Sequence, residues 1–252
     1  MAKTNIGWAS SSWNPYTWNC HKISPGCKHC YMFEMSRNLR HADARGVPQM
    51  RESAWSEIDK LPAGPVFINS MSDTYHPGVP VAWIHRIHNA FRARPHLTGL
   101  LLTKRIERAA VLAPLLDWPP NLWIGTTVEN QAYAWRLDYL RQITQAAGRF
   151  VSFEPMIGPV WPDLSDINWV IVGGESGAQR RPFDVGWASH LLMVARGRDI
   201  PFFYKQGSHL RPGKDRVLAG RTYDEVPAEF GQRKNWQPVA QRQKQSTQLT
   251  LL

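Results

Sequence analysis

The middle of the chain repeats one pattern, in which a short apolar run ends in polar or glycine residues and leads into a segment with helical spacing. Six such runs occur, at residues 65–74, 97–105, 121–130, 149–156, 168–177 and 200–207. Apolar residues recur at three- and four-residue intervals over 81–94, 105–116, 130–146 and 185–198, which predicts helices there. Because alternating strands and helices produce parallel strands, the sequence predicts an α/β fold on a parallel sheet.

A further strand is expected before the first cysteine, which gives six to seven parallel strands in all. This number favours a partial or closed β/α (TIM-like) barrel over a doubly wound sheet. Both architectures place their chemistry at the carboxyl ends of the strands. We expect one barrel domain over residues 1–230 and a disordered, basic, glutamine-rich tail over residues 231–252.

The charge balance favours a polyanionic partner. Thirty Lys and Arg residues against twenty Asp and Glu residues give a net charge of +10, which favours a nucleic acid or a nucleotide. The apolar runs are too short to span a bilayer, and the polar start lacks the apolar core of a signal peptide. We therefore expect a cytoplasmic protein with no membrane partner.

All three cysteines of the chain lie in one short segment, with the spacing C-x6-C-x2-C at Cys20, Cys27 and Cys30. A helix is predicted directly after them, over residues 31–44. Three thiols cannot all pair, and disulfides are rare in the cytoplasm, so the segment is predicted to bind a metal. Pro25 and Gly26 favour a turn that brings the later cysteines back toward the first.

Two kinds of metal site fit this segment. A [4Fe-4S] cluster on three thiolates leaves one iron open, and that iron can take the amino and carboxylate groups of S-adenosylmethionine. The alternative is a structural zinc held by the three cysteines and either His21 or His29. The zinc alternative would make the chain a non-catalytic protein that binds nucleic acid through its basic surface.

Several ordered motifs carry a family resemblance, at residues 13–32, 66–74, 101–106, 123–131, 152–160, 169–178 and 201–207. Over about residues 5–225 the chain resembles the phage-type three-cysteine-motif family of uncharacterised proteins. That family is similar to radical S-adenosylmethionine enzymes. The resemblance implies a partial barrel with the cluster in the loop after the first strand, and an electron-donor protein as a partner. In the familiar enzymes the cysteines are spaced C-x3-C-x2-C, whereas the first gap here is six residues. In those enzymes the residue before the last cysteine is aromatic and contacts adenine, and His29 stands at that position in this chain.

The predicted strand ends and the cysteine segment supply candidates for cofactor binding. Residues 69–73 offer acceptors for an ammonium group, Glu129 and Glu154 suit ribose hydroxyls or a sulfonium, and glycines 173 and 174 let the backbone approach a ligand. The cofactor-binding candidates are His29, Asn69, Ser70, Ser72, Asp73, Thr126, Glu129, Glu154, Gly173, Gly174 and Glu175. The candidates for substrate contact or catalysis are Lys104, Ser176, Lys205 and Gln206.

A hydrolase is a further alternative. Residues 174–178 nearly match a nucleophile elbow around Ser176, and Asp184 or Asp199 and then His209 follow in the expected order. This alternative leaves the cysteines unexplained. The sequence therefore predicts a radical S-adenosylmethionine enzyme whose 5′-deoxyadenosyl radical modifies or repairs a substrate, and a base as substrate would have to leave its stack.

Overall fold

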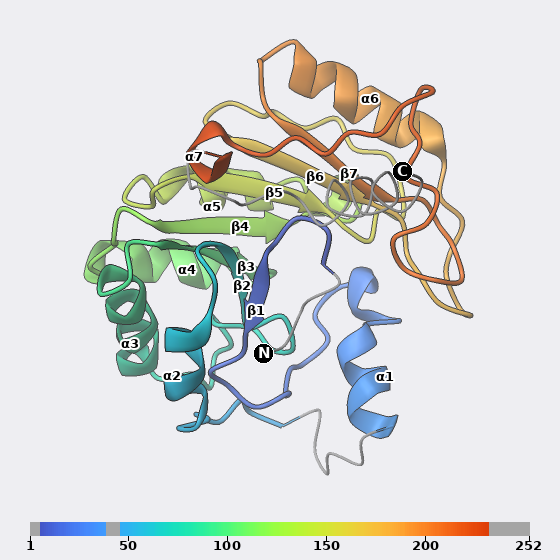
Figure 1. Cartoon of the computed structure of the whole chain (residues 1–252). Helices are drawn as coiled ribbons and strands as arrows, with labels where there is room; N and C mark the ends of the chain where they lie inside the picture. Colours follow the sequence, from blue (N-terminus) through green and yellow to red (C-terminus); the bar gives the residue numbers. More distant parts are fainter. Residues whose placement is uncertain (1–5, 39–45, 232–252) are drawn as a thin grey trace, which may run out of the picture.

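The computed structural model describes residues 6–38 and 46–231, and its centre is one sheet of seven parallel strands. The strands follow chain order across the sheet, which curls into a half-barrel (Figure 1). They are β1 (Ser11–Trp13), β2 (Gly64–Ile68), β3 (Leu97–Thr103), β4 (Leu122–Thr127), β5 (Arg149–Phe153), β6 (Trp169–Gly173) and β7 (Phe202–Gln206). The predicted α/β fold with a partial barrel is confirmed, and the doubly wound alternative is wrong because the strand order never reverses.

Helices connect the strands, and those between β2 and β7 cover the outer face of the curl. The helices are α1 (Tyr31–Asn38), α2 (Ala54–Glu57), α3 (Val81–Arg92), α4 (Ile106–Leu112), α5 (Arg136–Gln142), α6 (Val185–Arg196) and α7 (Ala228–Gly231). Short 3-10 helices lie at Pro25–Cys27, Ile58–Lys60, Ala113–Leu115 and Gln131–Tyr133. The later part of the helix predicted over 31–44, and almost all of the predicted tail, lie outside the described residues.

Two of the predicted helices are shorter than expected. The helix predicted over 105–116 ends at Leu112 and continues as a 3-10 turn, where Pro114 has no N–H to donate. The helix predicted over 130–146 is divided into a 3-10 turn and α5. Asn130 starts the 3-10 turn, since its side chain accepts a hydrogen bond from the backbone N–H of Ala132 at 3.0 Å.

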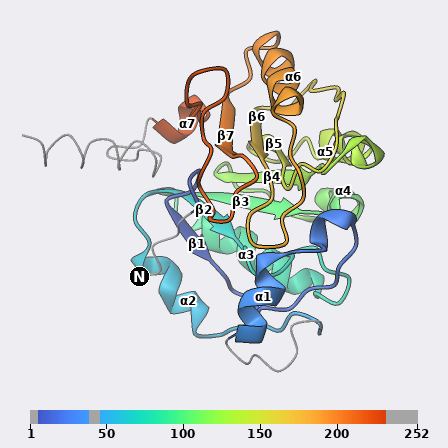
Figure 2. The same cartoon turned by 90° about the vertical axis from the view of Figure 1, so that its right-hand side faces the viewer.

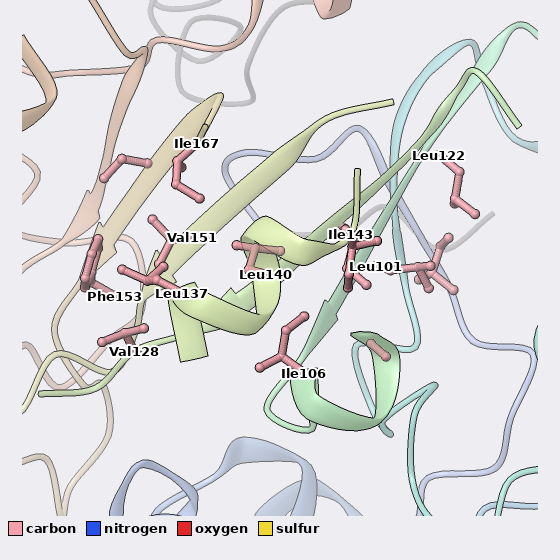
Figure 3. Close-up of a cluster of buried hydrophobic side chains, with 14 of the residues drawn as sticks. Leu101, Ile106, Leu122, Val128, Leu137, Leu140, Ile143, Val151, Phe153 and Ile167 are labelled. Atoms are coloured by element: carbon pink, nitrogen blue, oxygen red, sulfur yellow. The ribbon is translucent and has the colours of Figure 1, made fainter. Parts of the chain in front are cut away.

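Alternation along each strand divides the apolar residues into two layers. On β5, Val151 and Phe153 face the helices, whereas Phe150 packs inside the curl with Trp8 and Trp169. Figure 3 shows part of the outer layer, where Leu137 and Leu140 of α5, and Ile143 directly after it, pack over the strands. The inner layer fills the curl with large aromatic side chains, so only the end of the half-barrel beyond these rings can hold a ligand. The inner layer consists of Trp8, Ala9, Phe67, Leu100, Trp123, Phe150, Trp169, Ile171, Phe203 and Phe230.

The loop after β1, helix α1 and the loops after β6 and β7 all lie on the side of the molecule toward which the strands run, which faces the viewer in Figure 2. None of the helices in the described ranges is both long and apolar enough to cross a bilayer.

The outer layer predicts a large stability effect at α5. Leu140 is fully buried, so Leu140→Ala should lower the free energy of unfolding by about 2–5 kcal/mol, through lost apolar burial and a residual cavity. Leu115→Ala is the matched control, because Leu115 is 66% exposed and its loss should change that free energy by less than about 0.5 kcal/mol. Urea titrations of both variants measure the difference, and equal effects would contradict the packing described.

Candidate functional site

A cavity of about 710 Å³ opens at the carboxyl end of the half-barrel. The cysteine segment and α1 form one wall, and the ends of β2 to β7 form the other. Parallel β/α sheets bind ligands at this end, because the loops that follow the strands meet there. The cavity is therefore the candidate functional site.

Most of the residues predicted from sequence line this cavity. They are Cys20, Cys27, His29, Cys30, Ser70, Ser72, Asp73, Lys104, Glu154, Gly174, Glu175, Ser176, Lys205 and Gln206. Four predicted cofactor residues are not on its wall, namely Asn69, Thr126, Glu129 and Gly173. The structure thus brings the cysteines together with the ends of five strands, and it places these four residues off the cavity wall.

Strand parity and backbone conformation explain two of the exceptions. On β4 it is Thr127 that lines the cavity, whereas the hydroxyl of Thr126 donates to the backbone oxygen of Thr103 at 2.9 Å. Asn69 has a positive φ of 54°, and its amide nitrogen donates to Thr74 Oγ1 at 2.9 Å. Asn69 therefore shapes the turn after β2, a conformation that asparagine tolerates better than most residues.

The three thiols share the cavity wall but differ in exposure. Cys27 is buried and Cys20 and Cys30 are half-buried, and all three are free of disulfides. Burial, reinforced by nearby Asp73, raises the pKa of Cys20 to about 12 despite Arg105, and burial also raises the pKa of Cys30. These two thiols are protonated at neutral pH unless a cation displaces the proton.

The first anchor of the cysteine segment is an ion pair at the ends of β2 and β3. Asp73 accepts hydrogen bonds from Arg105 Nη1 at 2.8 Å and from the hydroxyl of Thr103 at 2.7 Å. The same guanidinium donates to the backbone oxygen of His21 at 3.0 Å, and its Nη1 lies 3.7 Å from the sulfur of Cys20. The Asp73 carboxylate thus fixes an arginine that holds the start of the segment.

The second anchor is Glu129, directly after β4. This residue is fully buried, and its carboxylate pairs with Lys104 at 2.9 Å and with Arg136 at 2.9 Å. The hydroxyl of Ser24 donates to the same carboxylate at 2.5 Å. Burial alone would raise the pKa of Glu129, but the two cations hold it below its usual range. A Cβ on Gly26 would lie 2.4 Å from the Glu129 side chain, so the segment packs directly on this carboxylate.

The third anchor lies after β6. Arg181 donates from Nε and Nη2 to the two carboxylate oxygens of Glu175, at 2.9 and 2.6 Å, and its Nη1 donates to the backbone oxygen of Pro25 at 3.0 Å. Although burial opposes it, this pairing keeps the pKa of Glu175 below its usual range. Asp73, Glu129 and Glu175 therefore hold the cysteine segment against three different parts of the sheet.

Glu154 and Lys205 form a different kind of pair. Glu154 directly follows β5, and Lys205 lies on β7. The two side chains form an ion pair with each other, and both residues line the cavity. Gln206 is committed to the backbone, since its side chain donates to the oxygen of Gly174 at 2.9 Å and accepts from the N–H of Gly213 at 2.7 Å. Of the predicted polar residues on β5 and β7, Glu154 and Lys205 are thus the two that can meet a ligand.

A family model described as protein of unknown function (DUF5131) matches residues 3–227. The chain belongs to this family. The match covers the whole half-barrel together with the cysteine segment and all three anchors, so the family and the candidate site share one unit of structure. Comparisons with curated proteins and with solved structures gave no match.

The donors around the cysteine segment are dispersed. In the ranges that the structure describes, no group of three or more His, Cys, Asp or Glu residues is arranged to hold a metal ion. His29 lines the cavity with the cysteines, whereas Nδ1 of His21 is 2.6 Å from Nε2 of His76.

The hydrolase alternative lacks its hydrogen-bonded triad. His209 Nδ1 accepts from the backbone N–H of Arg211 at 3.0 Å, and Asp184 accepts from the backbone N–H of Gly186 at 2.7 Å. Ser176 and His209 are joined through their backbones in an isolated β-bridge. Within residues 46–231, no side-chain hydrogen bond links Ser176, His209 and Asp184 or Asp199. A nucleophile and its base require such a contact.

Sequence reasoning missed the cations that complete the anchors, and one residue on the inner wall, Ser152. Arg105, Arg136 and Arg181 were visible only as positive charges, because nothing in their spacing identifies a carboxylate from another strand. Ser152 lies in the quoted run 152–160 and was not singled out, although strand parity directs its side chain to the same face as Phe150. Alternation along the strand is the signal that could have identified Ser152, because it lies two residues after the inward-facing Phe150.

The second anchor predicts a pH-dependent stability effect. Glu129→Gln should lower the free energy of unfolding at pH 7 by about 3–5 kcal/mol, because Lys104 and Arg136 lose a buried counter-charge. The folded-state pKa of Glu129 lies below its usual 4.5, so its contribution is complete above that pH and is lost as the pH falls through the folded value. The difference in free energy of unfolding between wild type and variant should therefore decrease below pH 4.5.

Urea titrations at several pH values between about 3 and 7 measure that difference. Glu107→Gln is the control, since Glu107 is exposed on α4 and has no ion pair among the described contacts. A difference at Glu129 that stays constant with pH, or that matches the control, would contradict the anchor.

Proposed function

We propose that the protein is a radical S-adenosylmethionine-type enzyme with a [4Fe-4S] cluster on Cys20, Cys27 and Cys30. The observation that carries the proposal is the shared placement of the three thiols on one cavity, at the carboxyl end of a seven-stranded parallel half-barrel. When bound, the cluster and S-adenosylmethionine supply a 5′-deoxyadenosyl radical. The resemblance to three-cysteine-motif proteins, which are similar to such enzymes, supports the same assignment.

The chemistry of the donors fits the cluster. Three thiols without a fourth cysteine would leave one iron open for the cofactor. A structural zinc would instead need a fourth protein donor, such as His21 or His29. The three thiols line one cavity.

The chain's own residues have distinct parts in this proposal. Ser72 lines the cavity and its hydroxyl has no hydrogen-bond partner in the part of the chain that the structure describes, so it can accept from an ammonium group such as that of S-adenosylmethionine. Glu154 and Lys205 can exchange their mutual ion pair for contacts with a polar ligand. Asp73, Glu129 and Glu175 bind arginines instead, and in the proposal they hold the cysteine segment in place.

The proposed chemistry also sets the surroundings. Free thiols and an oxygen-sensitive cluster fit a reducing compartment such as the cytoplasm. A separate electron-donor protein would supply the electron that reduces the cluster.

Anaerobic purification tests the proposal. The protein should be brown, with about four irons and matching labile sulfide per chain, and after reduction it should cleave S-adenosylmethionine to 5′-deoxyadenosine. Cys20→Ala, Cys27→Ala and Cys30→Ala should each reduce cleavage to background, because each removes one thiolate ligand.

Histidine variants separate the cluster from the zinc alternative. His21→Ala and His29→Ala should retain the iron, whereas a zinc site on three cysteines and one histidine would lose metal with one of them. His96→Ala is the control, since His96 is exposed directly before β3, at the opposite end of the strands from the cavity. A colourless protein with one zinc per chain, and no cleavage of the cofactor, would overturn the proposal.

A further inference from the structure

Several exposed cations around the cavity mouth lack the carboxylate partner that most arginines elsewhere on the molecule have. Away from the mouth, most arginines form ion pairs with carboxylates, and these pairs are Arg51–Glu57, Arg86–Glu52, Arg92–Asp117, Arg94–Asp59, Arg141–Asp138, Arg196–Glu225 and Arg198–Asp163. Five exposed cations beside the mouth have no carboxylate partner among the described residues, namely Lys22, Lys28, Arg180, Arg211 and Lys214. We call these five residues the rim cations.

The rim cations come from separate segments that border one opening. Lys22 and Lys28 lie between cavity-lining residues of the cysteine segment, and Arg211 lies between Leu210 and Pro212, which also line the cavity. Arg180 donates to the backbone oxygen of Gly177, another lining residue, at 3.2 Å. The backbone oxygen of Lys214 accepts from the N–H of Gly207 at 3.2 Å, directly after the lining residue Gln206. Figure 2 shows that the loops after β6 and β7 lie on the same side of the molecule as α1. Cations left unpaired around an opening favour a ligand with several separate negative charges.

The depth of the cavity has a different character. Its wall includes the aromatic side chains of Trp8 and Phe67 from the inner layer, and Trp18 from the loop after β1. The hydroxyl of Ser152 and the indole N–H of Trp8 are buried and have no hydrogen-bond partner among residues 6–38 and 46–231. Both residues are at least 98% buried and both line the cavity, and β5 parity directs Ser152 into the curl. A buried hydroxyl without a partner is costly, which favours a ligand that completes its hydrogen bonds.

We propose that the site takes a single-stranded nucleic acid, with one unstacked base in the depth of the cavity and the flanking phosphates on the rim cations. A base has both the flat aromatic face that Trp8 and Phe67 can contact and the polar edge that Ser152 can pair with. This inference rests on the proposed function for the reaction at that base, but binding itself requires neither reduction nor cleavage of the cofactor. A base within a duplex would first have to leave its stack, so single strands should bind better.

Fluorescence anisotropy tests the inference on the full chain purified anaerobically. Fluorescein-labelled single-stranded RNA and DNA of the same mixed sequence serve as separate ligands, beside the matching DNA duplex. Replacing Arg180, Arg211 and Lys214 by alanine together should weaken binding of the preferred strand at least about tenfold. The slope of log affinity against log salt should fall in magnitude by about 2, from about 0.7 for each lost phosphate contact on a single strand.

The control for charge is the double variant Lys60→Ala and Arg221→Ala. Both are exposed cations without a carboxylate partner among the described contacts, and neither borders the cavity. This variant should change affinity by less than about twofold. The inference would be overturned if the control lost as much affinity as the triple variant, or if the duplex bound more tightly than the single strand. It would also be overturned if polyglutamate displaced the labelled strand as well as the unlabelled strand does, a result that would favour an acidic protein partner.

Ser152 tests the base in the depth. Ser152→Ala should weaken binding by about 3- to 10-fold, the equivalent of one hydrogen bond, without lowering the melting temperature, because the hydroxyl has no partner among the described residues. Ser56→Ala, an exposed serine of α2, is the control and should bind like wild type. Wild-type affinity for Ser152→Ala would contradict a base in this position.

The two proposals fail separately. Strand binding that needs the rim cations and Ser152, in a protein without iron, would keep this inference and overturn the radical mechanism. A protein that holds iron and cleaves the cofactor but does not bind single-stranded nucleic acid would keep the radical mechanism and overturn this inference.

Discussion

The structure depends on three buried or nearly buried carboxylates that hold the cysteine segment against the sheet. Asp73, Glu129 and Glu175 follow β2, β4 and β6, and each pairs with an arginine. Two of those arginines also hold backbone oxygens of the segment, and Ser24 donates directly to Glu129. A loop of this kind has little core of its own, so charge pairs and hydrogen bonds determine where its thiols lie. Their placement on the cavity wall is thus a consequence of interactions made from three other strand ends.

Alternation along the strands decides what remains for a ligand. Outward residues such as Val151 and Phe153 pack under the helices, and inward aromatic residues such as Phe150 fill the curl. The inward positions nearest the carboxyl ends are smaller and more polar, as at Ser152 and Thr127, and the cavity begins there. The alternation of inward and outward side chains along the same strands therefore produces both a packed core and an open site.

The two proposals assign different regions of this cavity to different groups. The thiols lie on the wall formed by the cysteine segment, the unpartnered Ser152 lies on the strand side, and the rim cations lie outside. A radical generated next to the thiols would act on a group held deeper among the strands. The fixed anchors suit such chemistry, because a reactive species requires its surroundings to exclude water and to stay in place.

The sequence by itself determined the parallel α/β fold, the number of strands and the thiols as one group, since periodicity and cysteine spacing are local properties of the chain. It also identified the polar strand ends, so most of the predicted residues line one cavity. Only the tertiary structure decided which of them face a ligand. Thr126 and Thr127 differ only in strand parity, and Glu129 is occupied by Lys104 and Arg136 rather than by a cofactor. Such pairings join residues distant in sequence, so no local pattern can specify them.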